Sequence, residues 1–325
     1  MRKLLSTFLV LAIIFLVIFW GDPNIPIDWD NLLPDITISD AIGDISDAVN
    51  SVLPSYTLPN ISIPENSSFS IHFIDVGQAD AALILCDGEA LLIDGGNRAD
   101  SDLLYSYLRD YGISHLSAVI GTHGHEDHIG GIAGALQYAT VDTVYCSVTS
   151  YNSKAFANFV SAAQNRGAEL TVPKPGDTFT LGSAVCQFLG PITLDPEEPN
   201  NTSLVVKIVY GNTSFLFTGD AELSEETQIL DAGYDISCDV LKVGHHGSSS
   251  STSYRWLRDA NPTYAVISCG AGNDYGHPHD AVLSRLSDAE VKTYRTDLQG
   301  HIICTSNGND ITFQVTKNPD ADTLN

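Results

Sequence analysis

Short apolar runs alternate with amphipathic stretches from about residue 69 to the end of the chain. Apolar runs bounded by turn residues predict β-strands, and apolar positions at helical spacing predict helices. The alternation of strand and helix is typical of a layered α/β domain. We expect strands over 70–75, 81–86, 90–94, 116–120, 203–210, 214–218, 240–243, 264–268, 291–295, 301–304 and 311–315, and helices over 102–111, 222–230, 252–259 and 280–287.

The order of these elements occurs twice along the chain. In each half, a strand, a hairpin and an acidic turn precede a helix, a second strand and a His-rich turn. The acidic turns lie at 94–96 and 219–220, and the His-rich turns lie at 123–128 and 245–246. This order indicates a duplicated αβ unit, similar in pattern rather than in residue identity.

The N-terminal residues have a different character. Residues 4–20 are apolar apart from Ser6 and Thr7, and as a helix they would span about 25 Å, the short limit for crossing a bilayer. Basic residues precede the run and no small-x-small cleavage site follows it. We therefore expect a signal anchor over 1–20, with a cleaved signal peptide as the alternative. Either would place the domain outside the cytoplasmic membrane, anchored to it or secreted.

Residues 21–69 contain many Pro, Asp, Ser and Asn residues, and we interpret them as an acidic linker without a core of its own. Ile and Val recur at helical spacing over 38–52, which indicates a short amphipathic helix within the linker. We expect the folded domain over 70–317 and a C-terminal tail over 318–325.

Composition limits the classes of function. The chain of 325 residues has 15 basic and 40 acidic side chains and a net charge of −25, so we expect no strong basic surface for nucleic acid. Its six cysteines form no C-x-x-C pair, which excludes thiolate zinc ribbons and thioredoxin-like redox sites. We expect buried core thiols, because several lie in β-branched runs, with disulfides as the alternative in an extracytoplasmic domain.

The sequence Thr-His-Gly-His-Glu-Asp-His at 122–128 contains the candidate chemistry. It follows a predicted strand directly, where α/β proteins place their sites. Three imidazoles and two carboxylates so close together indicate a metal centre, because both groups are common metal ligands. We expect His123 and His125 on one side of an extended loop, and Asp127 and His128 turned toward a second centre.

The run T-H-G-H-E-D-H-I-G-G resembles the signature of the metallo-β-lactamase superfamily. Further motifs resemble one branch of it, the C-terminal hydrolase domain of ComEC-type competence proteins and its stand-alone relatives. The resemblance implies an α/β fold, an αββα four-layer sandwich with the metal site along one edge of its two sheets. In chain order the motifs are F-I-D-V-G-Q-A-D (73–80), L-L-I-D-G-G (91–96), N-N-T-S-L-V (200–205), F-T-G-D-A-E (217–222), L-K-V-G-H-H-G-S (241–248), Y-G-H-P-H (275–279) and R-T-D-L-Q-G (295–300).

The resemblance also implies roles for individual residues. One of His245 and His246 should complete the second metal site, and the other would contact substrate oxygens; strand periodicity does not choose between them. The implied metal ligands are His123 and His125 for a first ion, Asp127 and His128 for a second, and Asp220 as the bridge between them. Asp80, Asp94 and Asn201 would orient these ligands, and Asp127, His245 and His277 would act on the substrate.

One position departs from the superfamily pattern. Many members supply a further His to the first metal between the H-x-H-x-D-H run and the bridging Asp, but no His lies between 129 and 219 here. Asn200-Asn201 occupies that place, and an amide oxygen binds zinc more weakly than imidazole does. The number of divalent ions, one or two, and their identity, Zn or Mn, are therefore both left open. The remaining His72, His115 and His301 lie in or beside predicted strands, and we expect them to be structural or exposed.

Neither a P-loop nor a G-x-S-x-G motif occurs, so metal-bound hydroxide is the candidate nucleophile. The resemblance implies a metal-dependent hydrolase, a phosphodiesterase or nuclease, acting on a small-molecule or nucleic-acid phosphodiester. One alternative is a hydrolase of a small ester, lactone or lactam. Another is a non-catalytic binding module of a DNA-uptake or envelope assembly, against which the intact ligand positions argue. Residues 4–20 would be the contact with the membrane.

Overall fold

The computed structural model describes residues 68–195 and 197–324, and within these ranges no helix is long and apolar enough to cross a membrane. The predicted signal anchor and the amphipathic stripe over 38–52 lie outside the described residues. The first strand begins at Phe69, just before the predicted start of the domain. At the other end, Thr323 donates a hydrogen bond to the carbonyl of Thr293, so the predicted tail contacts the domain.

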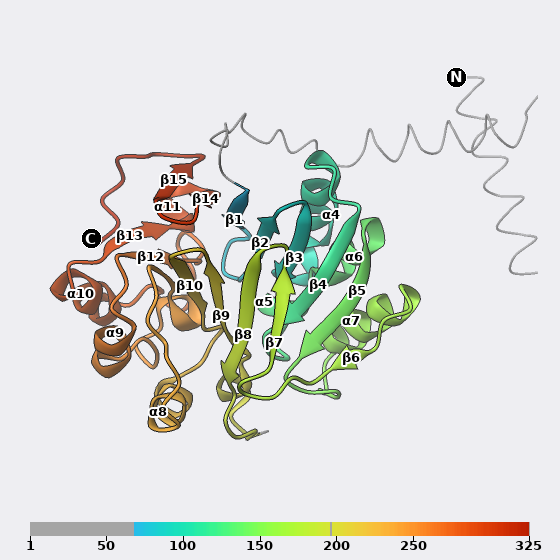
Figure 1. Ribbon diagram of the computed structural model, residues 1–325, viewed down its shortest axis with the longest axis horizontal. Helices are drawn as coiled ribbons and strands as arrows, with labels where there is room; N and C mark the ends of the chain where they lie inside the picture. Colours follow the sequence, from blue (N-terminus) through green and yellow to red (C-terminus); the bar gives the residue numbers. More distant parts are fainter. Residues whose placement is uncertain (1–67, 196, 325) are drawn as a thin grey trace, which may run out of the picture. The chain divides into compact units, whose positions relative to one another are not determined.

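The described strands form two mixed sheets, one of eight strands and one of seven (Figure 1). The first sheet has the order β15-β14-β1-β2-β3-β4-β5-β6, with β1 Phe69–Phe73, β2 Ala82–Cys86, β3 Glu89–Ile93, β4 His115–Gly121, β5 Thr140–Cys146, β6 Leu170–Thr171, β14 Ile302–Ser306 and β15 Ile311–Val315. The second has the order β13-β12-β11-β10-β9-β8-β7, with β7 Thr178–Leu181, β8 Ala184–Gly190, β9 Val205–Tyr210, β10 Thr213–Phe217, β11 Val240–Lys242, β12 Tyr264–Ile267 and β13 Lys292–Arg295.

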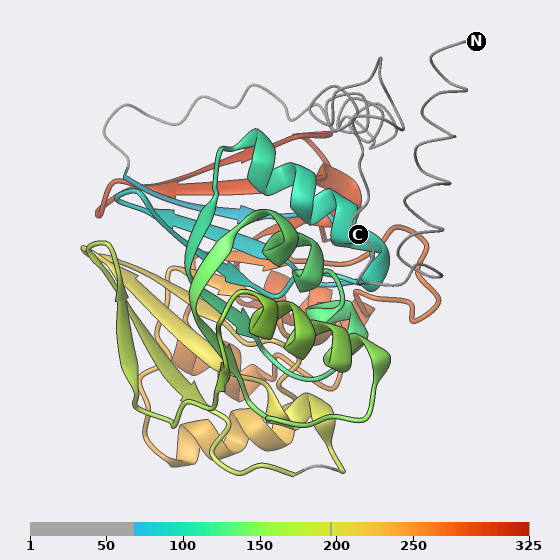
Figure 2. The same ribbon diagram turned by 90° about the vertical axis from the view of Figure 1, so that its right-hand side faces the viewer.

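Helices cover the outer face of each sheet (Figures 1 and 2). The α-helices are α4 Ser101–Asp110, α5 Glu126–Ile129, α6 Ile132–Tyr138, α7 Lys154–Asn165, α8 Leu223–Asp231, α9 Tyr254–Ala260, α10 Asp280–Asp288 and α11 Thr296–Gln299. The 3₁₀ turns are η1 Arg98–Asp100, η2 Pro199–Thr202 and η3 Gly244–Gly247. The expected α/β fold with two packed sheets is confirmed.

Alternation along each strand builds the layers. In β2, Leu83 packs toward the helices α4, α6 and α7, whereas Ile84 packs between the two sheets. In β10, Phe215 packs between the sheets and Leu216 packs toward α8 and α9. Because side chains of a strand point alternately to its two faces, both sheets are buried on both faces and three apolar layers form.

The two sheets repeat one arrangement of strands. β1, β2 and β3 are antiparallel and are followed by the parallel strands β4 and β5. β8, β9 and β10 are likewise antiparallel and are followed by the parallel strands β11 and β12. The predicted duplication is therefore present in the topology. It brings the ends of β3, β4, β10, β11 and β12 to one region, where the acidic and His-rich turns begin.

The sequence pattern predicts no elements in the segment between the two halves, where the structure has α6, β5, α7, β6, β7 and β8. β6 has only two residues, and β5 and β7 each have two exposed positions. Such strands give a weak apolar signal because only part of each is buried. β8 is mostly buried, so this reason does not apply to it.

The six cysteines are all buried and none forms a disulfide. Burial raises the pKa of the thiols of Cys146 and Cys238 to about 12, so both remain protonated at neutral pH. The expectation of core thiols is confirmed.

Candidate metal centre

The His-rich run begins directly after β4 and continues into the short helix α5. Thr122 donates hydrogen bonds from its backbone N and its Oγ1 to the two carboxylate oxygens of Asp94, each at 2.8 Å. A Cβ atom on Gly131 would overlap the backbone oxygen of Gly95. Glycine at this position therefore lets the chain after α5 pack against the acidic turn that follows β3, which places His128 beside Asp94.

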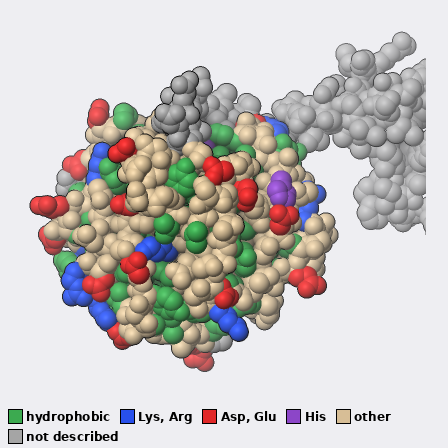
Figure 3. All heavy atoms as spheres, in the orientation of Figure 1, with side chains coloured by type: hydrophobic (Ala, Val, Ile, Leu, Met, Phe, Trp, Pro, Cys, Tyr) green, Lys and Arg blue, Asp and Glu red, His purple; other side chains and the backbone are tan. Residues whose placement is uncertain are grey.

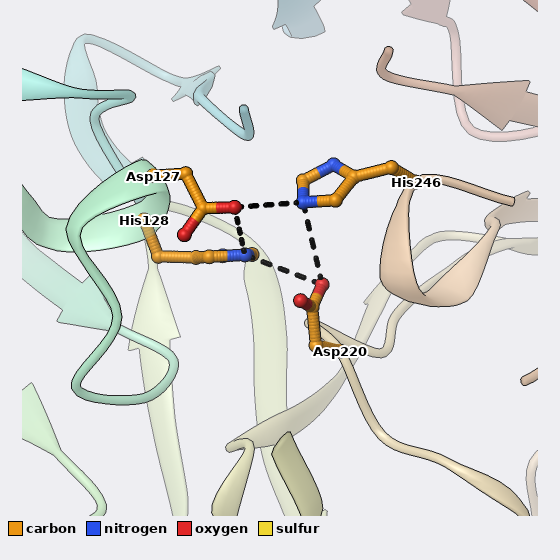
Figure 4. Close-up of side chains that lie close together, drawn as sticks. All are labelled: Asp127, His128, Asp220 and His246. Atoms are coloured by element: carbon orange, nitrogen blue, oxygen red, sulfur yellow. Dashed lines mark hydrogen bonds and ion pairs between the residues drawn. The ribbon is translucent and has the colours of Figure 1, made fainter. Parts of the chain in front are cut away.

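One group of potential ligands consists of Asp127, His128, Asp220 and His246 (Figure 4). Nε2 of His246 lies 3.2 Å from Oδ2 of Asp127, and Nε2 of His128 lies 3.2 Å from Oδ1 of Asp220. All four donor atoms lie within 4.8 Å of one another. Ligand bonds of about 2 Å place ligand atoms about 3–4 Å apart, so a single ion fits this group.

A second group consists of His123, His125 and Asp220. Nε2 of His123 lies 2.9 Å from Nδ1 of His125 and 3.9 Å from Oδ2 of Asp220. The two oxygens of Asp220 thus face different groups, Oδ1 toward His128 and Oδ2 toward His123. This is the geometry expected of a carboxylate that bridges two ions.

The adjacent histidines of η3 do not have the alternating orientation of residues in a β-strand. His245 and His246 have left-handed backbones, with φ of 48° and 53°. Residues other than glycine rarely adopt this conformation, and such strained positions cluster at functional sites. As a result, both rings face Asp220 rather than opposite ways: Nε2 of His246 lies 3.8 Å from its Oδ1, and Nε2 of His245 lies 3.7 Å from its Oδ2. His246 therefore belongs to the group with Asp127, and His245 lies beside the group with His123.

Buried acceptors fix the orientation of the histidine rings. Nδ1 of His128 donates to Asp94 at 2.8 Å, and Nδ1 of His246 donates to the carbonyl of Ser268 at 3.1 Å. Both Nε2 atoms are then left facing Asp220, as in metal-binding histidines that donate their other ring nitrogen. Asp80 lies 3.5 Å from Nδ1 of His246 and forms a buried ion pair with Lys242 at 2.9 Å. Asp80 and Asp94 thus lie against these rings, and their orienting roles toward a bound metal stay predictions.

Asn201 does not have the surroundings that the sequence predicted for it. Oδ1 of Asn201 accepts hydrogen bonds from the backbone N atoms of Glu222 and Glu225, so Asn201 caps the start of α8 and does not orient a ligand. Asn200 instead lines the pocket beside the donor groups, and its buried Oδ1 has no hydrogen-bond partner. The prediction for Asn201 was therefore wrong by one residue, because the turn η2 places its neighbour toward the site.

Charges within the cluster determine its protonation. Burial alone would lower the pKa of His246, but Asp220 and Asp80 outweigh it and raise the value to about 10. Burial would raise the pKa of Asp127, but His128 and His246 lower it to about 2. The same two histidines hold the pKa of Asp220 well below its usual range despite burial. The carboxylates therefore stay ionised at neutral pH and can attract a cation.

A pocket of about 330 Å³ opens onto both donor groups. Nδ1 of His277 lies 3.3 Å from Nε2 of Gln78, and its ring centre lies 5.5 Å from that of His245. Burial and the nearby His245 lower the pKa of His277 to about 4, so its ring is neutral at pH 7. The pocket is lined by Gln78, His125, Glu126, Asp127, Asn200, Asp220, His245, His246, Tyr275 and His277.

The other histidines singled out by the sequence lie outside the cluster, as expected. His72 is buried and its Nδ1 lies 2.9 Å from the hydroxyl of Tyr107. His115 is exposed on β4. Nδ1 of His301 accepts a hydrogen bond from the backbone of Asp75. These three side chains are structural or exposed.

Sequence reasoning missed a buried carboxyl group behind the site. Glu225 of α8 is 1% exposed, and neither of its oxygens makes a hydrogen bond. Burial and the neighbouring charge of Glu226 raise its pKa well above the ordinary value. Because glutamate in a helix is usually exposed, no sequence signal marks this one as buried. Burial therefore favours the neutral acid form of Glu225 in the folded protein.

The pH dependence of stability should reveal this group. At a pH above the pKa that Glu225 has in the unfolded chain, only the folded state keeps the proton on this residue. The free energy of unfolding of the wild type therefore falls by up to about 1.4 kcal/mol per pH unit as pH rises. Glu225→Gln removes this loss, and its stability relative to wild type should increase from about pH 5 to about pH 8 in urea denaturation. The exposed Glu169→Gln is the control. A Glu225→Gln difference that is constant across this range would show that Glu225 ionises in the folded protein.

Comparison with known proteins gives a consistent result. The profile of the metallo-beta-lactamase superfamily matches residues 74–271. ComE operon protein 3 of Bacillus subtilis is 31% identical over 255 residues, which cover 73% of this chain and 33% of that protein. Recombination protein 2 of Haemophilus influenzae is 28% identical over 309 residues, which cover 89% of this chain and 37% of that protein. The chain thus spans about a third of the length of these curated relatives.

Among solved structures, a mutant of the β-hydroxylase CmlA, a protein from Streptomyces venezuelae, matches with a TM-score of 0.51 and 12% sequence identity. The match covers 88% of this chain and 60% of that one. At this identity the similarity supports the fold alone.

Proposed function

Because the chain belongs to the metallo-β-lactamase superfamily, with ComEC-type competence proteins among its relatives, we propose that it is a metal-dependent hydrolase of phosphodiesters. The observation that supports this most strongly is the placement of Asp220. Its two carboxylate oxygens face two separate groups of potential ligands at the base of one open pocket. Pairs of metal ions in such an arrangement are typical of enzymes that displace an oxygen at phosphorus.

The donor set fits divalent zinc or manganese. Nε2 of His128 and Oδ1 of Asp220 are buried and have no hydrogen-bond partner beyond their mutual contact, so both are available to an ion. Imidazole ligands suit zinc, and carboxylate ligands occur with both zinc and manganese. A divalent ion held by these residues would lower the pKa of a bound water to about 7 and so would supply a nucleophile near neutral pH.

The side chains at the pocket have separable tasks. Asp127 is ionised and its side chain is 33% exposed, so it can accept a hydrogen bond from a water and hold it toward the substrate. His245 is 22% exposed, and its Nδ1 lies 3.1 Å from Glu222. If Gln78 donates to Nδ1 of the neutral His277, Nε2 of that ring carries the proton and can donate to a substrate oxygen.

The names of the relatives support a phosphodiester substrate. "Recombination protein 2" and "Competence protein ComA" denote proteins of recombination and competence, processes that handle DNA. On the face shown in Figure 3, the Lys and Arg side chains are scattered among Asp and Glu and form no continuous track for a long strand. We therefore propose that a short segment of substrate enters the pocket.

The decisive experiment is hydrolysis of bis(p-nitrophenyl) phosphate by the full chain, with p-nitrophenyl acetate as the ester control. Turnover of the diester should require Mn²⁺ or Zn²⁺, disappear after dialysis against EDTA and return when the ion is restored. Turnover of the ester alone would favour the small-ester hydrolase. An absence of both activities in a protein that contains the metal would favour the non-catalytic module.

A further inference from the structure

An exposed aromatic ring stands at the rim of the pocket. Tyr275 lies in the loop between β12 and α10 and is 69% exposed, the most exposed large apolar side chain among the described residues. It lines the pocket together with His277. Their rings are 5.6 Å apart between centres and inclined by 24°, so they lie nearly parallel. A mostly exposed tyrosine contributes little hydrophobic free energy to folding, so stability of the fold does not account for this placement.

The loop that carries Tyr275 is held firmly. Oδ1 of Asn273 accepts hydrogen bonds from the backbone N atoms of Tyr275 and His277, at 3.1 and 3.0 Å. Nδ2 of Asn273 donates to the carbonyl of Gly270 at 2.9 Å. From across the pocket, Gln78 accepts from the backbone of Gly270 at 3.0 Å. The loop therefore holds Tyr275 in place before a ligand binds, which reduces the conformational entropy lost on binding.

The charge of the pocket limits what else can recognise a substrate. Of the described residues that line it, none is Lys or Arg, and Glu126, Asp127 and Asp220 are acidic. A phosphate would thus have metal ions as its positive partners, and the rest of the substrate would meet neutral side chains. A planar, uncharged group fits this environment better than further phosphates do.

We propose that Tyr275, backed by His277, is a stacking platform for one nucleobase of the substrate whose phosphodiester reaches the donor groups. This inference rests on the proposed phosphodiesterase function and deepens it. Stacking on an aromatic side chain accepts any base, because every base has a π-face. The enzyme would therefore select flexible, single-stranded nucleotides without reading their sequence.

The test compares thymidylyl-thymidine with its doubly abasic analogue, using the full chain with Mn²⁺ and product detection by chromatography. Wild type should cleave the base-bearing dinucleotide with a kcat/KM about 10-fold higher than the abasic one. Tyr275→Ala should remove this preference by raising KM for thymidylyl-thymidine, with the abasic analogue unaffected. Tyr275→Phe should retain the preference. Tyr254→Ala, which removes another exposed tyrosine, on α9, is the matched control.

The outcomes separate the stacking proposal from the function on which it rests. If wild type cleaves both dinucleotides equally, or if Tyr275→Ala affects both equally, stacking is wrong while the phosphodiesterase remains. If wild type cleaves neither dinucleotide and not bis(p-nitrophenyl) phosphate, both are wrong. If it cleaves only the latter, nucleotides are not the substrate and the platform is rejected. The wild-type comparison requires no variant to fold.

Discussion

Replacement of Asp220 by asparagine or alanine is expected to remove both metal ions and to lower phosphodiester hydrolysis at least about 10³-fold. Its Oδ1 faces the group with His128, and its Oδ2 faces the group with His123. No other described residue belongs to both of the groups that face the pocket. Metal content per chain should be measured by mass spectrometry, together with kcat for bis(p-nitrophenyl) phosphate.

Folding must be monitored in the same experiment, because Asp220 is buried among histidines. Asp220→Asn keeps the volume of the side chain, and circular dichroism should show an unchanged fold. The exposed Asp102→Asn is the control for loss of one carboxylate elsewhere. If Asp220→Asn retains two ions and near-normal turnover, Asp220 does not bridge them and the assignment of the centre is wrong.

Asp127→Ala should have nearly as large an effect on activity but a smaller one on metal content. Asp127 belongs to one donor group only, so the variant should lose one ion and keep the other. Its partly exposed carboxylate is also the side chain placed to hold a water, and loss of such positioning typically costs about 10²–10⁴-fold in rate. The fold should persist, because the large apolar layers on both sides of each sheet do not include this residue.

The measurement is metal stoichiometry beside single-turnover hydrolysis at saturating Mn²⁺. Saturating Mn²⁺ separates ion binding from the positioning of water. It compensates for weakened ion binding, but it does not replace the carboxylate that holds the water. Turnover restored fully by excess metal would assign Asp127 to ion binding alone. Turnover that never changes would remove Asp127 from the mechanism.

The sequence predicted the parts of the site that are contiguous in the chain. His123, His125, Asp127 and His128 lie in one short run, and the spacing alone indicated two directions for their side chains. Asp220 lies far from this run in the chain, and its role as the bridge came only from the resemblance to the superfamily. The layered α/β class followed from the pattern itself, because most of the strands are apolar runs closed by turn residues, whereas the sandwich of two sheets was implied by the resemblance.

What the sequence could not supply depends on backbone conformation and long-range packing. His245 and His246 both have a left-handed φ, so their side chains do not alternate as they would in a strand. Strand periodicity therefore could not predict which of them belongs to the group with Asp127. The choice between Asn200 and Asn201 depends on the 3₁₀ turn η2, which rotates adjacent side chains by about a third of a turn. Glu225 is buried because α8 packs on the second sheet, a contact that a single helix sequence does not reveal.

The division of the ligands between two sheets affects how the protein acquires its metal during its lifetime. Asp220 and His246 belong to the second half of the chain and His128 to the first, so neither donor group is complete until the sheets have packed. A newly made chain therefore cannot retain ions tightly before it has folded. Ions at about a thousand times their dissociation constant would then stabilise the folded form by about 4 kcal/mol each. The concentration of free metal would thus shift the balance between folded and unfolded molecules.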